Sequence, residues 1–155
     1  MSNIIKKEDL KILIQKLKED GKKIVLTNGC FDILHIGHAE YLKESKSLGD
    51  ILFVGINSDS SVKKLKGDSR PLNNEIDRAK LLGYLKFVDY TVVFDEKTAD
   101  NIIELIQPNI YVKGGDYTKE SLPEYETLKK YNIDVAFVNF VNGYSTKKII
   151  EKIKT

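Results

Sequence analysis

The chain has two histidines, His35 and His38, which lie three residues apart with Gly37 between them. The run at residues 23–26 predicts a buried strand before them, and residues 39–47 predict a helix after them. The histidines therefore lie where a strand passes into a helix, the place where open α/β sheets bind ligands. A helix N-terminus attracts phosphate, and side chains three positions apart share one helix face. The pattern favours a site in which both imidazoles face one anion.

Other interpretations of these residues are weaker. A histidine near a strand end is often purely structural, but a pair with this spacing is harder to explain that way. With one cysteine and two histidines, a closed four-ligand zinc site would also need carboxylates. Cys30 is better explained as a small packing residue than as a nucleophile. Asp32 is a candidate metal ligand, with a helix N-cap as the alternative.

A cation-rich stretch follows the next predicted strand, residues 51–56. Residues 63–70 carry four cations within eight positions, which would clamp a phosphorylated substrate or simply be solvated. Lys66 and Arg70 are the candidates for phosphate contact. Arg78, on the following predicted helix, is a further candidate, with an ion pair to Glu75 as the alternative.

A second loop directly follows the short predicted strand at residues 110–112. Lys113 is a candidate for substrate phosphate, and Gly114 permits close approach of a ligand to the backbone. Asp116 can accept a hydrogen bond from a sugar hydroxyl, as carboxylates at such strand ends do. By itself, Gly-Gly-Asp predicts only a turn.

A third loop opens the last predicted helix, residues 145–153. Ser145 is expected to cap this helix, and Thr146 follows it. The same hydroxyls and the helix N–H groups suit a triphosphate, Gly143 eases its approach, and Lys147 could add charge.

Composition limits the classes of function. Lys and Arg total 25 against 23 Asp and Glu, a net charge of +2, which gives no support for nucleic-acid binding. One cysteine excludes an intramolecular disulfide and fits a reducing compartment. No apolar run approaches the ~20 residues that span a bilayer, and no secretory signal is evident. A cytoplasmic location and no membrane partner are expected.

Strands and helices alternate along the whole chain. This order predicts an α/β fold, a Rossmann-like open parallel sheet with helices on both faces. We expect one domain over residues 1–155, with an N-terminal helix within 1–21 and the α/β core in 22–155. Further strands are expected at 88–94, 110–112 and 135–138, and further helices at 8–19, 75–86, 98–106 and 123–131. The residues from Ser58 to Ser61 can cap another short helix.

Taken together, these stretches resemble a known family over nearly the full chain. His35-Ile36-Gly37-His38 matches the H-x-G-H signature of the nucleotidyltransferase superfamily. Residues 65–72 and 112–117, with Gly143-x-Ser145-Thr146, make D-glycero-β-D-manno-heptose 1-phosphate adenylyltransferases the best fit. Lys147 departs from the Ser-Thr-Thr usual there, which puts the third position of that motif in doubt.

The resemblance implies an enzyme that joins a sugar 1-phosphate to ATP and releases pyrophosphate, with Mg²⁺ as cofactor and a homo-oligomeric assembly, a dimer or larger. His35, His38 and Lys66 would be catalytic. The implied nucleotide contacts are Gly29, Cys30, Phe31, His35, Gly37, His38, Gly114, Asp116, Gly143, Ser145 and Thr146; the implied substrate-phosphate contacts are Lys66, Arg70, Arg78 and Lys113. A CTP-dependent glycerol-3-phosphate cytidylyltransferase is the alternative enzyme, and a non-catalytic nucleotide-binding module the alternative of another class.

Overall fold

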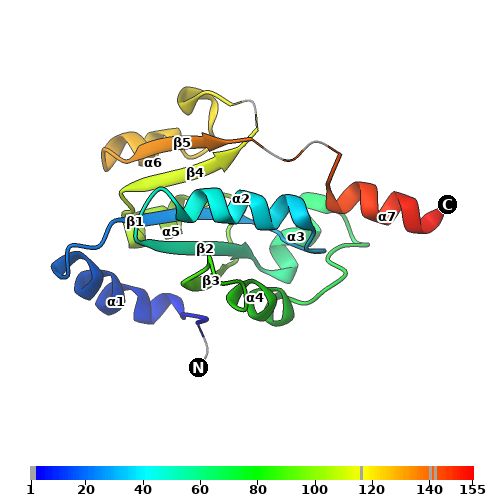
Figure 1. Cartoon of the computed structure of the whole chain (residues 1–155), viewed down its shortest axis with the longest axis horizontal. Coiled ribbons are helices and arrows are strands. Elements are labelled where there is room, and N and C mark those ends of the chain that lie inside the picture. Colours follow the sequence, from blue (N-terminus) through cyan, green and yellow to red (C-terminus); the bar gives the residue numbers. More distant parts are fainter. Residues whose placement is uncertain (1–2, 116, 140, 142) are drawn as a thin grey trace.

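The structure, a computed structural model, describes residues 3–115, 117–139, 141 and 143–155. Its centre is a five-stranded sheet in the order β3-β2-β1-β4-β5 (Figure 1). Every neighbouring pair of strands is parallel, as the alternation of strands and helices predicted. The strands are β1 (Ile24–Gly29), β2 (Ile51–Asn57), β3 (Tyr90–Phe94), β4 (Ile110–Gly114) and β5 (Asp134–Val138).

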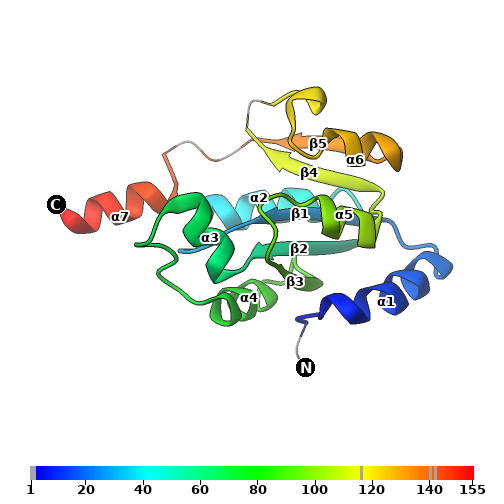
Figure 2. The same cartoon turned by 180° about the vertical axis from the view of Figure 1, so that it is seen from behind.

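Helices cover both faces of the sheet (Figures 1 and 2). They are α1 (Lys7–Glu19), α2 (Ile36–Lys46), α3 (Asp59–Lys66), α4 (Glu75–Gly83), α5 (Asp100–Ile106), α6 (Tyr125–Lys130) and α7 (Thr146–Lys154), with a 3₁₀ turn at Lys119–Ser121. None of the helices in the described part of the chain is long and apolar enough to cross a membrane.

Two hydrophobic clusters lie on opposite faces of the sheet, because successive side chains of a strand point to opposite sides. Leu26 and Phe53 belong to one hydrophobic cluster, which packs under α1, α5 and α6. Val25 and Leu52, the preceding residues of the same strands, belong to the other cluster, under α2 and α4. Each central strand is therefore buried on both sides, which explains its nearly continuous apolar sequence.

The amino ends of the strands are fixed by side chains. Asp50 accepts the N–H of Lys23 at 2.7 Å, and Asn109 accepts that of Ile24 at 2.8 Å. Asp89 accepts the N–H of Leu52 at 2.8 Å and pairs with Lys46 at 2.5 Å. These contacts hold the edge of the sheet that lies away from the loops singled out by the sequence.

Three predicted boundaries were wrong. The helix after the histidines begins at Ile36 rather than at residue 39, so His38 lies inside its first turn. Residues 63–66, predicted as loop, form the last turn of α3. The next helix, α4, ends at Gly83 instead of continuing to residue 86. Helix ends are the part of an element that hydrophobic periodicity locates least well.

The strand order changes direction between β1 and β4. The chain builds outward from β1 through β2 to β3, then crosses to the other side of β1 for β4 and β5. In open α/β sheets, such a switch point opens a crevice at the carboxyl ends of the strands. The loops after β1 and β4 border this crevice.

Candidate active site

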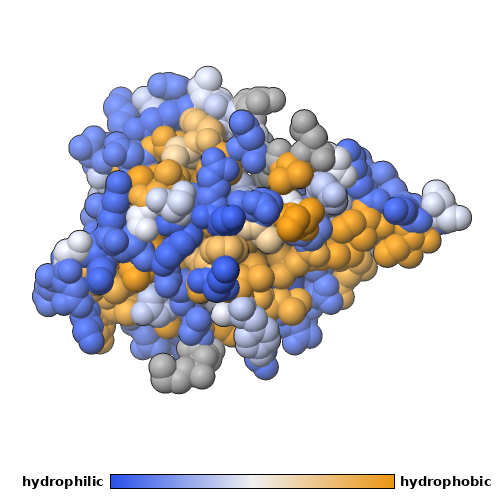
Figure 3. All heavy atoms as spheres, in the orientation of Figure 1, coloured by the Kyte–Doolittle hydropathy of each residue, from blue (hydrophilic) through white to orange (hydrophobic). Residues whose placement is uncertain are grey.

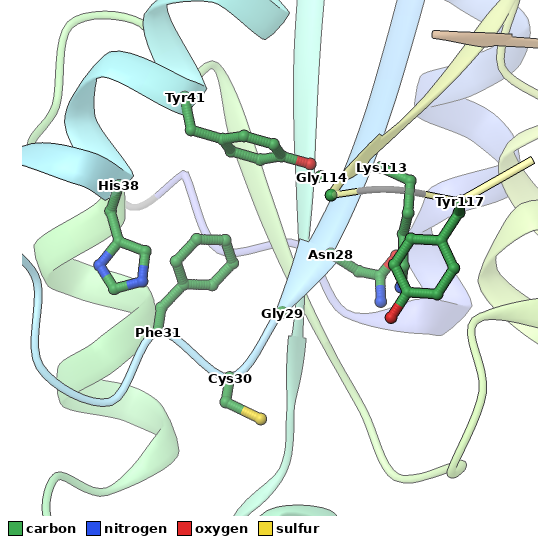
Figure 4. A pocket seen from close by; sticks show the side chains of 10 residues that line it. Asn28, Gly29, Cys30, Phe31, His38, Tyr41, Lys113, Gly114 and Tyr117 are labelled. Atoms are coloured by element: carbon green, nitrogen blue, oxygen red, sulfur yellow. The ribbon is translucent and has the colours of Figure 1, made fainter. Parts of the chain in front are cut away.

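A pocket of about 630 Å³ lies at the switch point (Figure 4). Its walls come from the carboxyl ends of β1 and β4 and from the first turns of α2. The lining residues are Asn28, Gly29, Cys30, Phe31, His38, Tyr41, Lys113, Gly114, Gly115 and Tyr117. The pocket thus brings together the histidine turn and the glycine loop, which lie about eighty positions apart in the sequence.

The two histidines lie together at the start of α2. His35 is the N-cap residue, and its ring stacks on that of His38 with centroids 3.8 Å apart. The His35 ring occupies the space above Gly37, where a Cβ atom would come within 2.8 Å of it. Gly37 therefore makes room for the His35 ring.

The pocket environment keeps both imidazoles neutral. Burial lowers the pKa of His38 from 6.5 to about 4, and repulsion between two protonated rings, His35 and His38, contributes to the shift. Burial also lowers the pKa of His35. Nδ1 of His38 accepts the His35 backbone N–H at 3.4 Å, so the proton of the neutral ring belongs on Nε2. His38 can then donate from Nε2 to an anion in the pocket.

The lowered pKa of His38 predicts an acid-sensitive fold. Between pH 6.5 and about 4 the unfolded chain binds a proton at His38 and the native protein does not. Stability contributed by the neutral ring is therefore present above pH 6.5 and is lost as the pH falls toward 4. We expect the melting temperature of the wild type to drop more between pH 7 and pH 5 than that of His38→Gln, measured by thermal unfolding. Equal drops would contradict the lowered pKa.

The turn after β1 is held in a strained conformation. Phe31 has a φ of 51°, in the left-handed region that favours glycine, and its ring packs in the core. Among the residues that the structure describes, none accepts a hydrogen bond from the Phe31 N–H. This N–H belongs to the loop that lines the pocket, and it remains our candidate donor to a phosphate.

Asp32 is a structural residue, contrary to its prediction as a metal ligand. Its buried carboxylate accepts the N–H groups of Leu72 and Asn73 at 2.9 Å and pairs with Nε of Arg70 at 2.7 Å. The two backbone N–H donors and the Arg70 guanidinium hold the pKa of Asp32 below its usual value, against the effect of burial. It is not a helix cap either: it anchors residues 70–73 beside the pocket.

Arg78 is also structural, and its prediction as a phosphate ligand was wrong. Its side chain is fully buried, with donors to the carbonyls of Cys30 at 2.8 Å, Asn57 at 2.7 Å and Asn73 at 2.9 Å. Its charge pairs with Asp59 at 2.8 Å, and not with Glu75, the alternative partner. Arg78 thus joins the segments that follow β1 and β2 to the segment that leads into α4.

Two other cations, Lys66 and Arg70, lie close to the turn after β1. Lys66 ends α3, and among the described residues it has no ion pair. The charges of Lys66 and Arg70 both act on the Cys30 thiol, although burial dominates and raises the pKa of that thiol. Cys30 is therefore a neutral packing residue, as predicted. Arg70 uses Nε for Asp32, which leaves its terminal nitrogens for a ligand.

The glycine loop after β4 forms the other wall of the pocket. Lys113 and Gly114 line it, together with Tyr117, whose ring is half exposed. Asp116 lies outside the described residues. Tyr117, Asn28 and Tyr41 also line the pocket, and only their positions beside the motifs could have suggested them from the sequence.

The start of α7 lies against the histidine turn. Ser145 caps the helix by accepting the Lys148 N–H at 3.0 Å, as predicted. The Thr146 hydroxyl donates to the Ile33 carbonyl at 3.0 Å, so this proton is not left for a phosphate. The Tyr144 ring lies parallel to that of His35 at 6.3 Å. Two helix N-termini, of α2 and α7, therefore lie close to His35, and Gly143 precedes the second in the left-handed region.

This geometry predicts two separable effects for Ser145→Ala combined with Thr146→Ala. Loss of the cap and of the Ile33 contact should lower stability by up to ~2 kcal/mol. Loss of the Ser145 hydroxyl should also weaken ATP binding at this helix end. Thermal unfolding with and without Mg-ATP separates the effects, since the stabilisation by ligand follows affinity. If the ATP-dependent shift stays intact while the apo midpoint drops, the two residues serve the fold alone.

One family model matches most of the chain. The family described as cytidylyltransferase-like matches residues 26–152, from β1 to α7. The chain belongs to the cytidylyltransferase-like family. The match includes the histidine turn, the α3 cations, the glycine loop and the start of α7, so the whole pocket lies in the part shared with this family.

Two individual relatives match more than nine-tenths of the chain. The "Bifunctional protein HldE" of a Nitratiruptor species is 47% identical over 148 residues, covering 96% of this chain and 31% of that protein. The protein of the same name from Campylobacter jejuni subsp. doylei is 51% identical over 142 residues, covering 92% and 30%. This cytidylyltransferase-like chain thus spans about 30% of the length of the curated relatives it matches.

A solved structure shares the fold. The crystal structure of the lipopolysaccharide core biosynthesis protein from Thermoplasma volcanium superposes with a TM-score of 0.63 at 35% identity. The match covers 81% of this chain and all of that one. The Rossmann-like parallel sheet predicted from the sequence is therefore confirmed, and it is a cytidylyltransferase-like sheet.

Proposed function

We propose that this enzyme joins a sugar 1-phosphate, D-glycero-β-D-manno-heptose 1-phosphate, to the α-phosphate of ATP, giving an ADP-sugar and pyrophosphate. The observation that carries the proposal is the pocket at the switch point, with His38 on one wall and the glycine loop on the other. Support for the sugar comes from the relatives named HldE and from the structural relative in lipopolysaccharide core biosynthesis. An ATP-consuming synthesis also fits the expected cytoplasmic location.

The attacking phosphate oxygen is already an anion, so the reaction needs neither a general base nor a protein nucleophile. Catalysis then consists of in-line positioning and of neutralising the charge that builds on the α-phosphate and the leaving pyrophosphate. Nε2 of His38 donates to the triphosphate, with His35 and the N-terminus of α2 beside it. The Phe31 N–H donates to the α-phosphate, while Lys66 and Arg70 contribute charge.

Among the described residues, the chain provides few side-chain ligands for a magnesium ion. No group of three or more His, Cys, Asp or Glu side chains in the described residues could hold a metal, and Asp32 is occupied by its N–H donors. We propose that Mg²⁺ arrives with the nucleotide as Mg-ATP, held by phosphate oxygens and water.

The proposal is tested by a substrate panel. Pyrophosphate release is measured with ATP or CTP, each combined with heptose 1-phosphate or glycerol 3-phosphate, in Mg²⁺. We expect ATP with heptose 1-phosphate to give the highest kcat/KM. Preference for CTP with glycerol 3-phosphate would favour the cytidylyltransferase alternative. Binding of Mg-ATP without release in any pair would leave a non-catalytic nucleotide-binding module.

A homo-oligomer, a dimer or larger, is part of this proposal. Helix α7 has no buried residue, and Ile149, Ile150 and Ile153 share one of its faces. Ile153 is 76% exposed, and the hydrophobic atoms along α7 continue onto the body of the molecule (Figure 3). We expect light scattering to give the mass of a dimer or larger, and Ile153→Glu to reduce it. A wild-type mass of one chain would contradict the assembly.

A further inference from the structure

Asn28 is a pocket residue to which neither the sequence motifs nor the proposed mechanism gives a task. It is the penultimate residue of β1, and its side chain lines the pocket. Figure 4 shows it beside Lys113 and Tyr117, on the side of the pocket opposite His38. The histidine turn and the helix N-termini lie on the His38 side. Asn28 therefore faces the part of a substrate that lies away from the reacting phosphates.

The orientation of the Asn28 amide is fixed from behind the pocket. The hydroxyl of Tyr111, on the neighbouring strand β4, donates a hydrogen bond to Oδ1 of Asn28. Tyr111 is fully buried, and burial raises the pKa of its hydroxyl well above 10, so it stays protonated and remains a donor. With Oδ1 accepting from Tyr111, the amide nitrogen is the group left to the pocket.

Packing against β2 confines the Asn28 side chain on the side away from Tyr111. A Cβ atom at Gly55, opposite Asn28 on β2, would lie 3.2 Å from the Asn28 Cβ and 2.5 Å from Cδ1 of Ile102. The space above Gly55 is therefore filled, and Asn28 has neighbours on both β2 and β4. A side chain held in this way binds a ligand without first losing rotamer freedom.

We propose that Asn28 is a specificity-determining residue, whose Nδ2 group donates a hydrogen bond to a hydroxyl oxygen of a bound substrate, and that Tyr111 positions it. A neutral amide donor suits a hydroxyl oxygen, and the pocket wall around it holds no carboxylate among the described lining residues. The hydroxyl belongs either to the ribose of ATP or to the sugar phosphate. This inference rests on the proposed function for the identity of both substrates.

Three variants separate the role of the Asn28 N–H donors from that of the Tyr111 hydroxyl that positions them. Asn28→Asp is isosteric and keeps an acceptor for Tyr111 but removes both N–H donors. Asn28→Ala removes the whole amide, and Tyr111→Phe removes only the buried hydroxyl. We expect Asn28→Asp and Asn28→Ala each to lower kcat/KM about tenfold or more, which is the worth of a strong hydrogen bond. Near wild-type kcat/KM for Asn28→Asp would overturn the proposal, because Asn28 would then serve only as the partner of Tyr111.

The positioning role of Tyr111 is tested by a double-mutant cycle. Tyr111→Phe should lower kcat/KM in the wild-type background and have no effect when Asn28 is already Ala, since Tyr111 acts through Asn28. Independent, multiplicative effects in the double variant would overturn the positioning role. Thermal unfolding of each variant shows whether it is folded. If Tyr111→Phe does not fold, Asn28→Asp and Asn28→Ala still test the role of Asn28.

The source of the hydroxyl follows from the substrates used as probes. If it is a ribose hydroxyl, wild-type discrimination between ATP and its 2′-deoxy or 3′-deoxy form disappears in Asn28→Ala. If it belongs to the sugar, the KM for heptose 1-phosphate rises instead. Discrimination and both KM values unchanged would overturn the inference. Calorimetric binding of Mg-ATP and of heptose 1-phosphate to the same variants tests Asn28 without turnover, so failure of the proposed reaction remains a separate result.

Discussion

Replacing His38 with Ala should lower the turnover of pyrophosphate release by ~10²–10³, the cost of removing one preorganised donor to transition-state charge. The reason is the single proton of the neutral ring: Nδ1 accepts from the His35 backbone, so Nε2–H is the donor that faces the pocket. Single-turnover measurement of pyrophosphate release checks this expectation, with thermal unfolding to show that the variant is folded. His35→Ala should also lower turnover, because its ring stacks on that of His38.

Cys30→Ser provides the matched control. Cys30 lines the same pocket, but its thiol is neutral and is not a nucleophile in the proposed reaction. Because serine keeps the size and the backbone of this implied nucleotide contact, we expect Cys30→Ser to lose far less turnover than His38→Ala. Near wild-type kcat for His38→Ala would assign His38 a structural role and remove it from the mechanism.

Arg78→Met should lower the free energy of unfolding by about 3–5 kcal/mol, because it removes the four hydrogen bonds of a fully buried side chain, each worth about 1 kcal/mol. The substitution keeps most of the apolar length but removes the donors to the carbonyls of Cys30, Asn57 and Asn73. The Asn57 carbonyl is buried, so leaving it without this donor adds to the loss. Urea unfolding followed by circular dichroism gives the measurement.

Asp59→Asn is the control for the ionic part of this network. The Asp59 side chain is 40% exposed, so its pair with Arg78 is screened by water, and its loss should cost no more than about 1 kcal/mol. An effect of Asp59→Asn as large as that of Arg78→Met would mean that charge pairing, rather than the carbonyl contacts, holds these segments together.

The features that were predicted correctly from the sequence are those set by residues close together in the chain. Apolar runs identified the central strands, and the strand-to-helix position of His35 and His38 identified the edge of the sheet where the pocket opens. Ser58 and Ser145 were recognisable as helix caps from residue type, and both accept the N–H three residues on. These features depend on neighbours in the chain, which a single sequence displays.

The features that were missed depend on partners far apart in the chain. Arg78 and Asp32 carry charges that suit phosphate or metal, and the contacts that occupy them come from residues about 20 to 50 positions away. The role of Asn28 depends on Tyr111, 83 positions later. Residue type alone does not distinguish a charge that is satisfied internally from one that is offered to a ligand.

The side chains that fix the amino ends of the strands have a consequence for how such a protein diverges. Asp50, Asp89 and Asn109 secure β1 and β2 at the edge of the sheet remote from the pocket. Replacements in the glycine loop or at the start of α7 leave those contacts untouched. Selection for a new ligand can therefore act on one end of the sheet while the other preserves the scaffold, and a designer can alter the ligand preference of this chain by the same route.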